Sequence, residues 1–207
     1  MKRRILILCP HTDDGEFGCG GTAVKFLKQG HDIHYCAFSS ASKSLRSGLD
    51  KDILVGEMMD AMSVLGINNT HLFDYDARDF PKHRQSILDD MIVLRKEIKP
   101  SIVFLPSTFD IHQDHKVICR EGVRAFKNCT IFGYELPWNN LSFTTQMFVT
   151  LDRYEVDAKW LAIEKYKSQN HRLYFSESFV RNWVSTRGKQ IGVAWAEAFE
   201  VIRLIIN

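Results

Sequence analysis

Two short clusters that combine imidazole and carboxylate side chains each follow an apolar run. They are His11-Thr12-Asp13-Asp14, after residues 5–9, and His112-Gln113-Asp114-His115, after residues 102–106. Imidazole and carboxylate together suit zinc or iron(II), so the pattern indicates one divalent metal shared by the two clusters. Two histidines and one aspartate fill three of four to six coordination positions. A water bound at an open position would become a nucleophile.

The adjacent carboxylates Asp13 and Asp14 strengthen this interpretation. Two such groups on one loop repel each other, and the pair is easier to understand if a cation neutralises one while the other transfers protons. A structural alternative is that one of them only caps the following helix. A single histidine of either cluster, taken alone, is more often a hydrogen-bonded structural residue than a ligand. The metal hypothesis therefore depends on the two clusters meeting.

Apolar runs alternate with segments of helical period along the chain. We expect strands over residues 5–9, 34–39, 71–73, 102–105, 130–136 and 147–151, helices over 18–29, 51–65, 84–98, 114–126, 156–168 and 177–187, and a final apolar run over 199–206. This alternation predicts an α/β fold with a Rossmann-like, doubly wound, mostly parallel sheet and helices on both faces. We expect a single domain over residues 1–207.

The topology supplies a reason for the two clusters to meet. Doubly wound sheets bind ligands beyond the carboxyl ends of their strands, where the strand order reverses. In a Rossmann-like order that point lies between the first and fourth strands. The two clusters follow those strands.

Composition narrows the classes of partner. The net charge is +2, from 27 basic and 25 acidic residues, which gives no electrostatic reason to expect nucleic acid or an anionic membrane. No stretch approaches the roughly twenty apolar residues of a membrane span. The five cysteines are odd in number and lack a C-x-x-C pair, so we expect reduced, buried thiols and a cytoplasmic protein.

Two other cofactor hypotheses fit less well. The run from Gly18 to Ala23 matches G-x-G-x-x-A, but it does not follow the first strand directly, and the second strand ends in Phe38-Ser39-Ser40 without the acidic residue of a dinucleotide site. These glycines are expected to allow tight backbone packing behind the metal loop. A His-x-Asp pair with a distant histidine is also typical of non-haem iron oxygenases. Those enzymes have an all-β barrel.

The run from Pro10 to Thr22, together with the second cluster, resembles the PIG-L/LmbE-like family of zinc-dependent N-deacetylases (N-acetylglucosaminyl conjugate deacetylases). Further matches extend over most of the chain. They are Leu65-Gly66-Ile67, the stretch 159–169 with Ala162, Ser168 and Gln169, and Ala196-Glu197-Ala198-Phe199. The chain departs from the family at Thr12 and Gln113, where proline is usual, at Gly15, where many members are acidic, and in a serine-rich loop over 39–48. The proline changes alter loop stiffness more than ligand chemistry.

The resemblance implies removal of an N-acetyl group from an amino sugar of the GlcNAc type in a small glycoconjugate. By motif position, it implies His11, Asp14 and His115 as ligands of Zn²⁺, with Fe²⁺ or another divalent metal as alternatives. Asp13 is implied as the general base, and His112 as a stabiliser of the oxyanion or leaving group.

Substrate contacts are expected from two loops. The resemblance implies a substrate-binding role for Arg46, in the loop after the second strand, and Trp138 is expected to border the substrate cleft. Members of the family commonly form oligomers, which leaves a homo-oligomer open. Two rival functions are a metal-dependent hydrolase of a non-sugar amide or ester, and a non-catalytic carbohydrate-binding subunit with a vestigial metal site. The second is disfavoured because every implied catalytic side chain is present.

Overall fold

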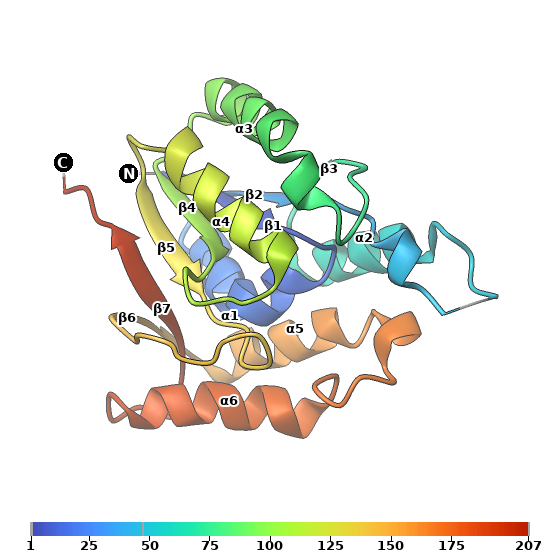
Figure 1. The fold of residues 1–207 in the computed structure, drawn as a ribbon. Coiled ribbons are helices and arrows are strands. Elements are labelled where there is room, and N and C mark those ends of the chain that lie inside the picture. The colour runs from blue at the N-terminus through green and yellow to red at the C-terminus, as the bar shows by residue number, and fades with distance from the viewer. Residues whose placement is uncertain (1, 47, 207) are drawn as a thin grey trace.

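A seven-stranded sheet with the order β3-β2-β1-β4-β5-β7-β6 forms the centre of the protein. The computed structural model describes residues 2–46 and 48–206. Five strands run parallel to one another, namely β1 (Arg4–Cys9), β2 (Asp32–Ala37), β3 (Asn69–Leu72), β4 (Ile102–Pro106) and β5 (Thr130–Tyr134). The last two, β6 (Met147–Leu151) and β7 (Trp195–Arg203), join as antiparallel strands. The predicted mostly parallel α/β sheet is confirmed (Figure 1).

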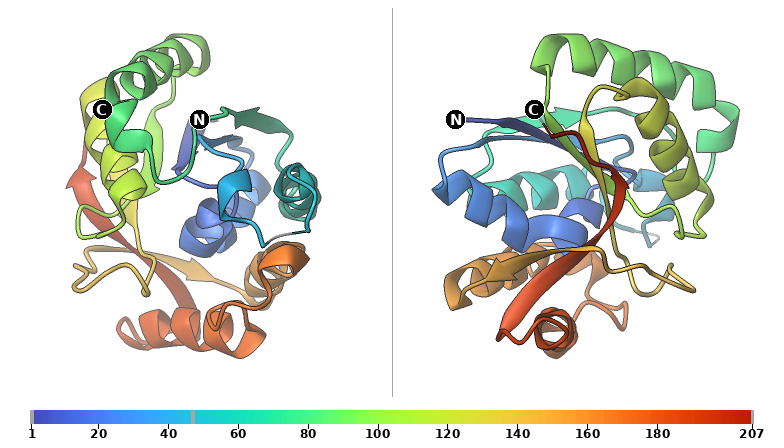
Figure 2. Two further views of the ribbon diagram at one scale, coloured as in Figure 1. Left: turned by 45° about the vertical axis from the view of Figure 1, so that its right-hand side comes forward. Right: turned by 90° about the vertical axis from the view of Figure 1, so that its left-hand side faces the viewer.

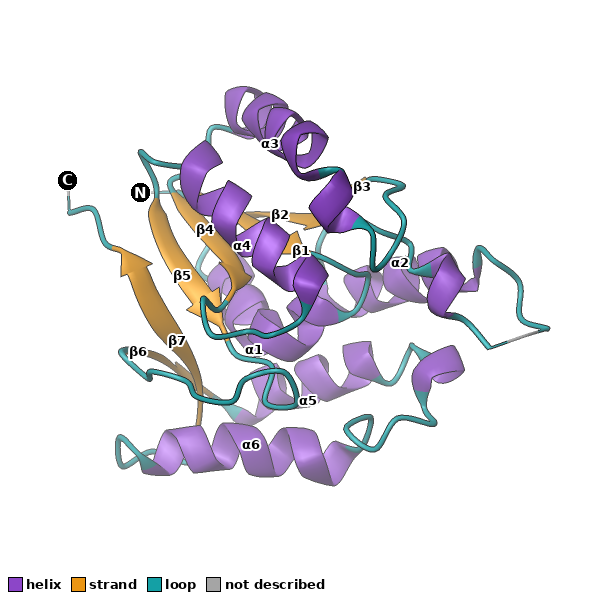
Figure 3. Cartoon of the chain, viewed as in Figure 1, coloured by secondary structure: helices purple, strands orange, loops and turns teal. Residues whose placement is uncertain are grey.

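Helices cover both faces of this sheet (Figures 2 and 3). They are α1 (Asp14–Lys28), α2 (Ile53–Leu65), α3 (Arg84–Ile98), α4 (Gln113–Ala125), α5 (Arg153–Ile163) and α6 (Glu177–Lys189). Successive side chains of β1 point to opposite faces, so Ile5 and Ile7 pack with α1, α2 and α5, whereas Leu6 and Leu8 pack with α3 and α4. This alternation explains why an unbroken apolar run forms a strand that is buried on both sides.

The strand order reverses between β1 and β4, as predicted. These strands are parallel neighbours, with Ile7 opposite Phe104. Their carboxyl ends therefore lie side by side, and the loops that follow them carry the two polar clusters. No helix in the described ranges is both long and apolar enough to cross a membrane.

Helix α1 begins earlier than predicted, at Asp14 instead of residue 18, and it bends at Cys19, where φ is −150° and ψ is 24°. A long-range contact supports the bend. The buried carboxylate of Glu197 on β7 accepts hydrogen bonds from the N–H groups of Gly21 (3.1 Å) and Thr22 (2.7 Å). These donors restart the helix after the bend, so Glu197 acts as a cap supplied by a distant strand.

The glycines of this helix pack tightly, as expected. A Cβ atom on Gly18 would lie 2.4 Å from the ring of Tyr134, and one on Gly21 would lie 2.6 Å from Leu151. The glycines therefore let α1 approach the sheet closely enough to place Asp14 at the strand ends.

The predicted helix over 156–168 is shorter in the structure. It ends at Ile163 and is followed by a 3₁₀ turn, η3 (Lys167–Gln169). Residues 199–203 of the final apolar run form the end of β7 (Trp195–Arg203), and residues 204–206 lie beyond the strand.

Candidate metal centre

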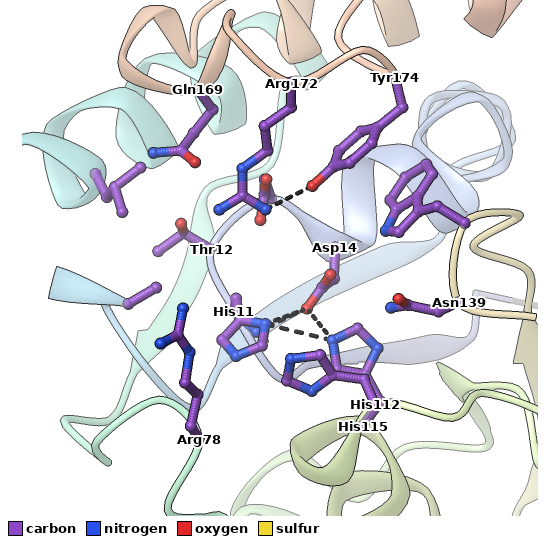
Figure 4. Close-up of a pocket in the computed structure, with 14 residues that line it drawn as sticks. His11, Thr12, Asp14, Arg78, His112, His115, Asn139, Gln169, Arg172 and Tyr174 are labelled. Carbon is purple, nitrogen blue, oxygen red and sulfur yellow. Dashed lines mark hydrogen bonds and ion pairs between the residues drawn. The ribbon is translucent and has the colours of Figure 1, made fainter. Parts of the chain in front are cut away.

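Three side chains from the two clusters meet at the carboxyl ends of β1 and β4. Oδ2 of Asp14 lies 3.2 Å from Nδ1 of His11 and 3.4 Å from Nε2 of His115, and these two nitrogens are 3.3 Å apart (Figure 4). Ligand atoms bound about 2.1 Å from one tetrahedral ion lie about 3.4 Å from each other. The triangle of donor atoms therefore has the size that a single zinc-like ion requires.

The ring nitrogen of each histidine that faces away from this triangle is bonded to a buried carboxylate. Nδ1–H of His115 donates to Oδ2 of Asp110 at 2.7 Å, and Nε2–H of His11 donates to Oδ2 of Asp114 at 3.1 Å. Asp110 and Asp114 are 1% and 0% exposed. Such carboxylates fix the tautomer and direct the free lone pair of each ring toward a metal. The donor set therefore fits a divalent ion in chemistry as well as in spacing.

Sequence reasoning missed Asp110, although it lies just before the second cluster. Its Oδ1 also accepts the N–H of His112 at 2.8 Å. The start of the same loop is held by Glu200 on β7, which accepts hydrogen bonds from the Ser107 hydroxyl and from the N–H of Thr108, both at 2.9 Å. Strand β7 thus fixes the loop that carries Asp110, the carboxylate bonded to His115.

A buried polar network contacts the backbone of the first cluster. The carbonyl oxygen of Thr12 accepts hydrogen bonds from the phenols of Tyr35 (2.8 Å) and Tyr166 (2.6 Å), and both phenols also contact the carboxyl group of Glu16. Burial raises the pKa of Glu16 to about 8. This network holds the backbone between His11 and Asp13 in place.

The carboxylates of the first cluster have different surroundings. Asp13 stands at the cap position of α1 but accepts no capping hydrogen bond, so the capping alternative has no support. Burial and the neighbouring Asp14 raise the pKa of Asp13 to about 6. Burial disfavours the charge of Asp14, but the facing rings of His115 and His11 outweigh it and hold the pKa of Asp14 below its usual range. Asp14 is thus the better anion, and Asp13 the better proton carrier.

His112 caps α4, and this contact sets its hydrogen-bonding role. Its Nδ1 accepts the N–H of Asp114 at 3.2 Å, so the neutral ring carries its proton on Nε2. Burial and the neighbouring His115 and His11 lower the pKa of His112 to about 4. The neutral ring can therefore donate a hydrogen bond. The three imidazoles also offer nitrogens within 4.8 Å of one another, so distance alone would allow His112 as a ligand.

A pocket of about 160 Å³ opens onto these groups, and it includes Asp13, His112 and Trp138 in its lining. Trp138 stacks on Tyr174, with ring centroids 3.9 Å apart and an angle of 6° between the rings. The side chains drawn in Figure 4 also include several that sequence reasoning did not assign to the site, among them Arg78, Gln169, Arg172 and Tyr174. Of Arg78, Gln169, Arg172 and Tyr174, only Gln169 could have been found from the sequence, because it ends the stretch 159–169 that matches the family.

Arg46 has a different position. It lies exposed on the loop after β2 and is not among the described residues that line the pocket. Its substrate-binding role stays a prediction of the resemblance.

Comparison with known proteins shows which family the sequence matches. The sequence profile of the PIG-L family, described as GlcNAc-PI de-N-acetylase, matches residues 6–126, which hold both clusters. The chain is 28% identical to the uncharacterized deacetylase YaiS of Escherichia coli (strain K12) over 178 residues, which are 81% of this chain and 92% of YaiS. It is 29% identical to diacetylchitobiose deacetylase of Thermococcus kodakarensis (strain ATCC BAA-918 / JCM 12380 / KOD1) over 132 residues, 59% of this chain and 49% of that protein.

Solved structures share the fold over the whole chain. The conserved protein TT1542 from Thermus thermophilus has a TM-score of 0.81 at 22% identity, covering 100% of this chain and 97% of that one. GalB, the 4-carboxy-2-hydroxymuconate hydratase from Pseudomonas putida KT2440, has a TM-score of 0.79 at 19% identity and covers 100% and 98%. Because one of these proteins is a hydratase, the shared fold does not by itself determine the reaction.

Proposed function

Because the chain belongs to the PIG-L family, we propose that it is a metal-dependent N-deacetylase, which removes the acetyl group from an amino-sugar conjugate of the GlcNAc type. The observation that carries the proposal is the triangle of donor atoms from His11, Asp14 and His115, with sides of 3.2 to 3.4 Å. The similarity to diacetylchitobiose deacetylase supports an amino sugar as the substrate.

The three triangle residues would hold the ion, which we propose to be Zn²⁺, with Fe²⁺ or another divalent metal as alternatives. Such an ion lowers the pKa of a bound water to about 7 and polarises a carbonyl oxygen. The buried carboxylates Asp110 and Asp114 keep both imidazoles in the tautomer that binds it.

Asp13 is the general base in this proposal. It lines the pocket beside Asp14, and its carboxylate is free of the capping bond that would occupy it. Asp13 takes the proton of the attacking water and then donates it to the nitrogen of the leaving amine. Its burial beside a second carboxylate favours a group that can both accept and return a proton.

His112 stabilises the carbonyl oxygen as it gains negative charge. The ring donates through Nε2–H, because Nδ1 is occupied by the N–H of Asp114. A neutral donor of this kind supplies stabilisation without a change of protonation state during the reaction.

Trp138 and Tyr174 provide the aromatic wall against which a sugar ring would pack. We also propose a cytoplasmic location, since all five cysteines are buried free thiols.

The test is acetate release by zinc-loaded protein from N-acetylglucosamine, diacetylchitobiose and N-acetylated amino acids. Asp13→Asn should keep one equivalent of metal and lose turnover by about 10²- to 10⁴-fold, since it removes the base alone. His11→Ala should lose the metal as well. Near-normal turnover by Asp13→Asn would contradict the base assignment. Faster release from amino acids would favour the non-sugar hydrolase, and bound metal without turnover would favour the carbohydrate-binding subunit.

A further inference from the structure

Two arginines reach the same pocket from loops that are far apart in the sequence. Arg78 lies in the turn between β3 and the 3₁₀ turn η2 (Phe80–Lys82), and Arg172 lies between η3 and α6. Figure 4 shows them on different sides of the pocket. Within the ranges 2–46 and 48–206, neither guanidinium has a carboxylate oxygen within 4.0 Å.

The guanidinium of Arg172 is half-buried and held in place. Its Nη1 donates a hydrogen bond to the phenol oxygen of Tyr174 at 2.5 Å, and the Tyr174 ring is in turn stacked on Trp138. A guanidinium has five N–H donors in a fixed fork, and this contact uses one of them. Burial of a charged group is costly unless a partner compensates it. A ligand with an opposite charge would supply that partner.

Arg78 is fixed through its backbone. Its φ is 71°, in the left-handed region that side chains other than glycine seldom adopt, and its N–H donates to Oδ2 of Asp114 at 2.6 Å. Ala41, which also lines the pocket, has a φ of 54°. Unfavourable backbone conformations of this kind persist where the surroundings enforce them, and they concentrate at ligand sites. The loop is therefore held in a conformation that brings Arg78 to the pocket.

Simpler explanations account for only part of this arrangement. Solvation explains an exposed arginine such as Arg78, but it does not explain why a strained loop carries that side chain to the pocket. Burial disfavours the charge of Arg172, but the hydrogen bond to Tyr174 and the negative charges of Asp13 and Asp14 outweigh it and raise the pKa of the guanidinium; neither carboxylate forms an ion pair with Arg172 within 4.0 Å. The other carboxylates near the centre already have partners, since Asp110 and Asp114 are bonded to the histidines.

We propose that Arg78 and Arg172 together bind an oxyanion, a carboxylate or a phosphate, that is attached to the amino sugar. The proposal rests on the proposed function and specifies its substrate class, an N-acetylated amino sugar with an acidic substituent. Guanidinium groups bind such oxyanions through paired, charge-assisted hydrogen bonds. The arginines set specificity, and Asp13 and His112 carry out the reaction.

The first test compares acidic and neutral substrates on the zinc-loaded protein. The acidic ones are N-acetylglucosamine 1-phosphate, N-acetylglucosamine 6-phosphate and N-acetylmuramic acid, and the neutral ones are methyl N-acetylglucosaminide and diacetylchitobiose. At least one acidic substrate should have a kcat/KM about tenfold to a hundredfold above the neutral ones. The phosphate and carboxylate substrates identify which oxyanion is bound. Turnover of neutral sugars with equal or higher kcat/KM would overturn the proposal and leave the deacetylase function intact.

Variants show whether the arginines cause the preference. Arg78→Gln and Arg172→Gln should each lower kcat/KM for the preferred acidic substrate about tenfold more than they lower kcat/KM for the neutral substrates. If one oxyanion contacts both residues, the double variant should lose less than the product of the single losses. A matched control is Arg153→Gln, which removes an exposed arginine from α5 outside the pocket. Equal losses on acidic and neutral substrates would overturn the proposal.

A binding measurement separates this proposal from the deacetylase function. Calorimetry with zinc-loaded protein should show tighter binding of the acidic product analogue, glucosamine 1-phosphate, glucosamine 6-phosphate or muramic acid, than of methyl glucosaminide, and both glutamine variants should remove the difference. Circular dichroism establishes that the variants are folded. If no sugar releases acetate but the acidic product still binds more tightly, the function fails and the oxyanion site stands. Equal binding of acidic and neutral products overturns the site.

Discussion

Replacement of Asp110 by asparagine tests the origin of metal affinity most directly. Asp110 is 1% exposed and accepts two hydrogen bonds, from Nδ1–H of His115 at 2.7 Å and from the N–H of His112 at 2.8 Å. A carboxylate serves both donors with separate oxygens, but a carboxamide has one oxygen, so one donor must face an NH₂ group. The lost charge-assisted hydrogen bond contributes about 1.5–3 kcal/mol. Asp110→Asn should therefore weaken zinc binding by about 10- to 100-fold.

The assay is competition for zinc against a chromophoric chelator at fixed pH, with thermal unfolding measured in parallel. Glu121→Gln is the matched control, since Glu121 lies on α4 with His115, is also 1% exposed, and pairs with Arg84 and Arg124 far from the donor triangle. It should lower stability without changing the dissociation constant for zinc. An Asp110→Asn protein that is folded and binds zinc within about twofold of the wild type would refute the reasoning.

Two further substitutions test the site and its support. His112→Gln keeps an N–H donor and His112→Ala does not, so both should retain metal, and the glutamine variant should keep about tenfold more turnover; metal loss in either variant would instead make His112 a ligand. Gly18→Ala places a methyl group 2.4 Å from Tyr134 and should lower the free energy of unfolding by about 1–3 kcal/mol in urea titrations. Its control, Gly56→Ala in the first turn of α2, meets no atom within 4 Å and should raise that energy by up to about 1 kcal/mol. Equal effects at the two glycines would contradict the packing role of Gly18.

The parts of the fold that follow from local periodicity could be predicted from the sequence. Helix α3 and strand β6 have the predicted bounds, since each has a clear apolar period between polar or turn-forming neighbours. The start of α1 could not be predicted because its glycines have low helix propensity. The bend at Cys19 could not be predicted either, because the N–H groups of Gly21 and Thr22 beyond it are bonded to Glu197, a residue far away in the sequence, which no local pattern connects to them.

The same distinction holds for the site. His11, Asp14 and His115 could be expected to meet because β1 and β4 are adjacent in a doubly wound sheet, and the position of each cluster follows from its strand. Arg78 and Arg172 could not be placed in this way. Their positions depend on the path of two loops, one of them with a left-handed residue, and neither loop has a sequence pattern that fixes its path.

Asp114 connects the metal centre to the wall of the pocket. A single oxygen of this buried carboxylate accepts both Nε2–H of His11, at 3.1 Å, and the N–H of Arg78, at 2.6 Å. Asp114, which orients the proposed metal ligand His11, therefore also holds the loop that carries Arg78, a proposed substrate-binding residue. Since the fold is shared with a hydratase, the reaction must be selected by such local arrangements. In our proposal the donor triangle and Asp13, whose carboxylate makes no capping hydrogen bond, select the reaction, and the two arginines of the pocket select the substrate.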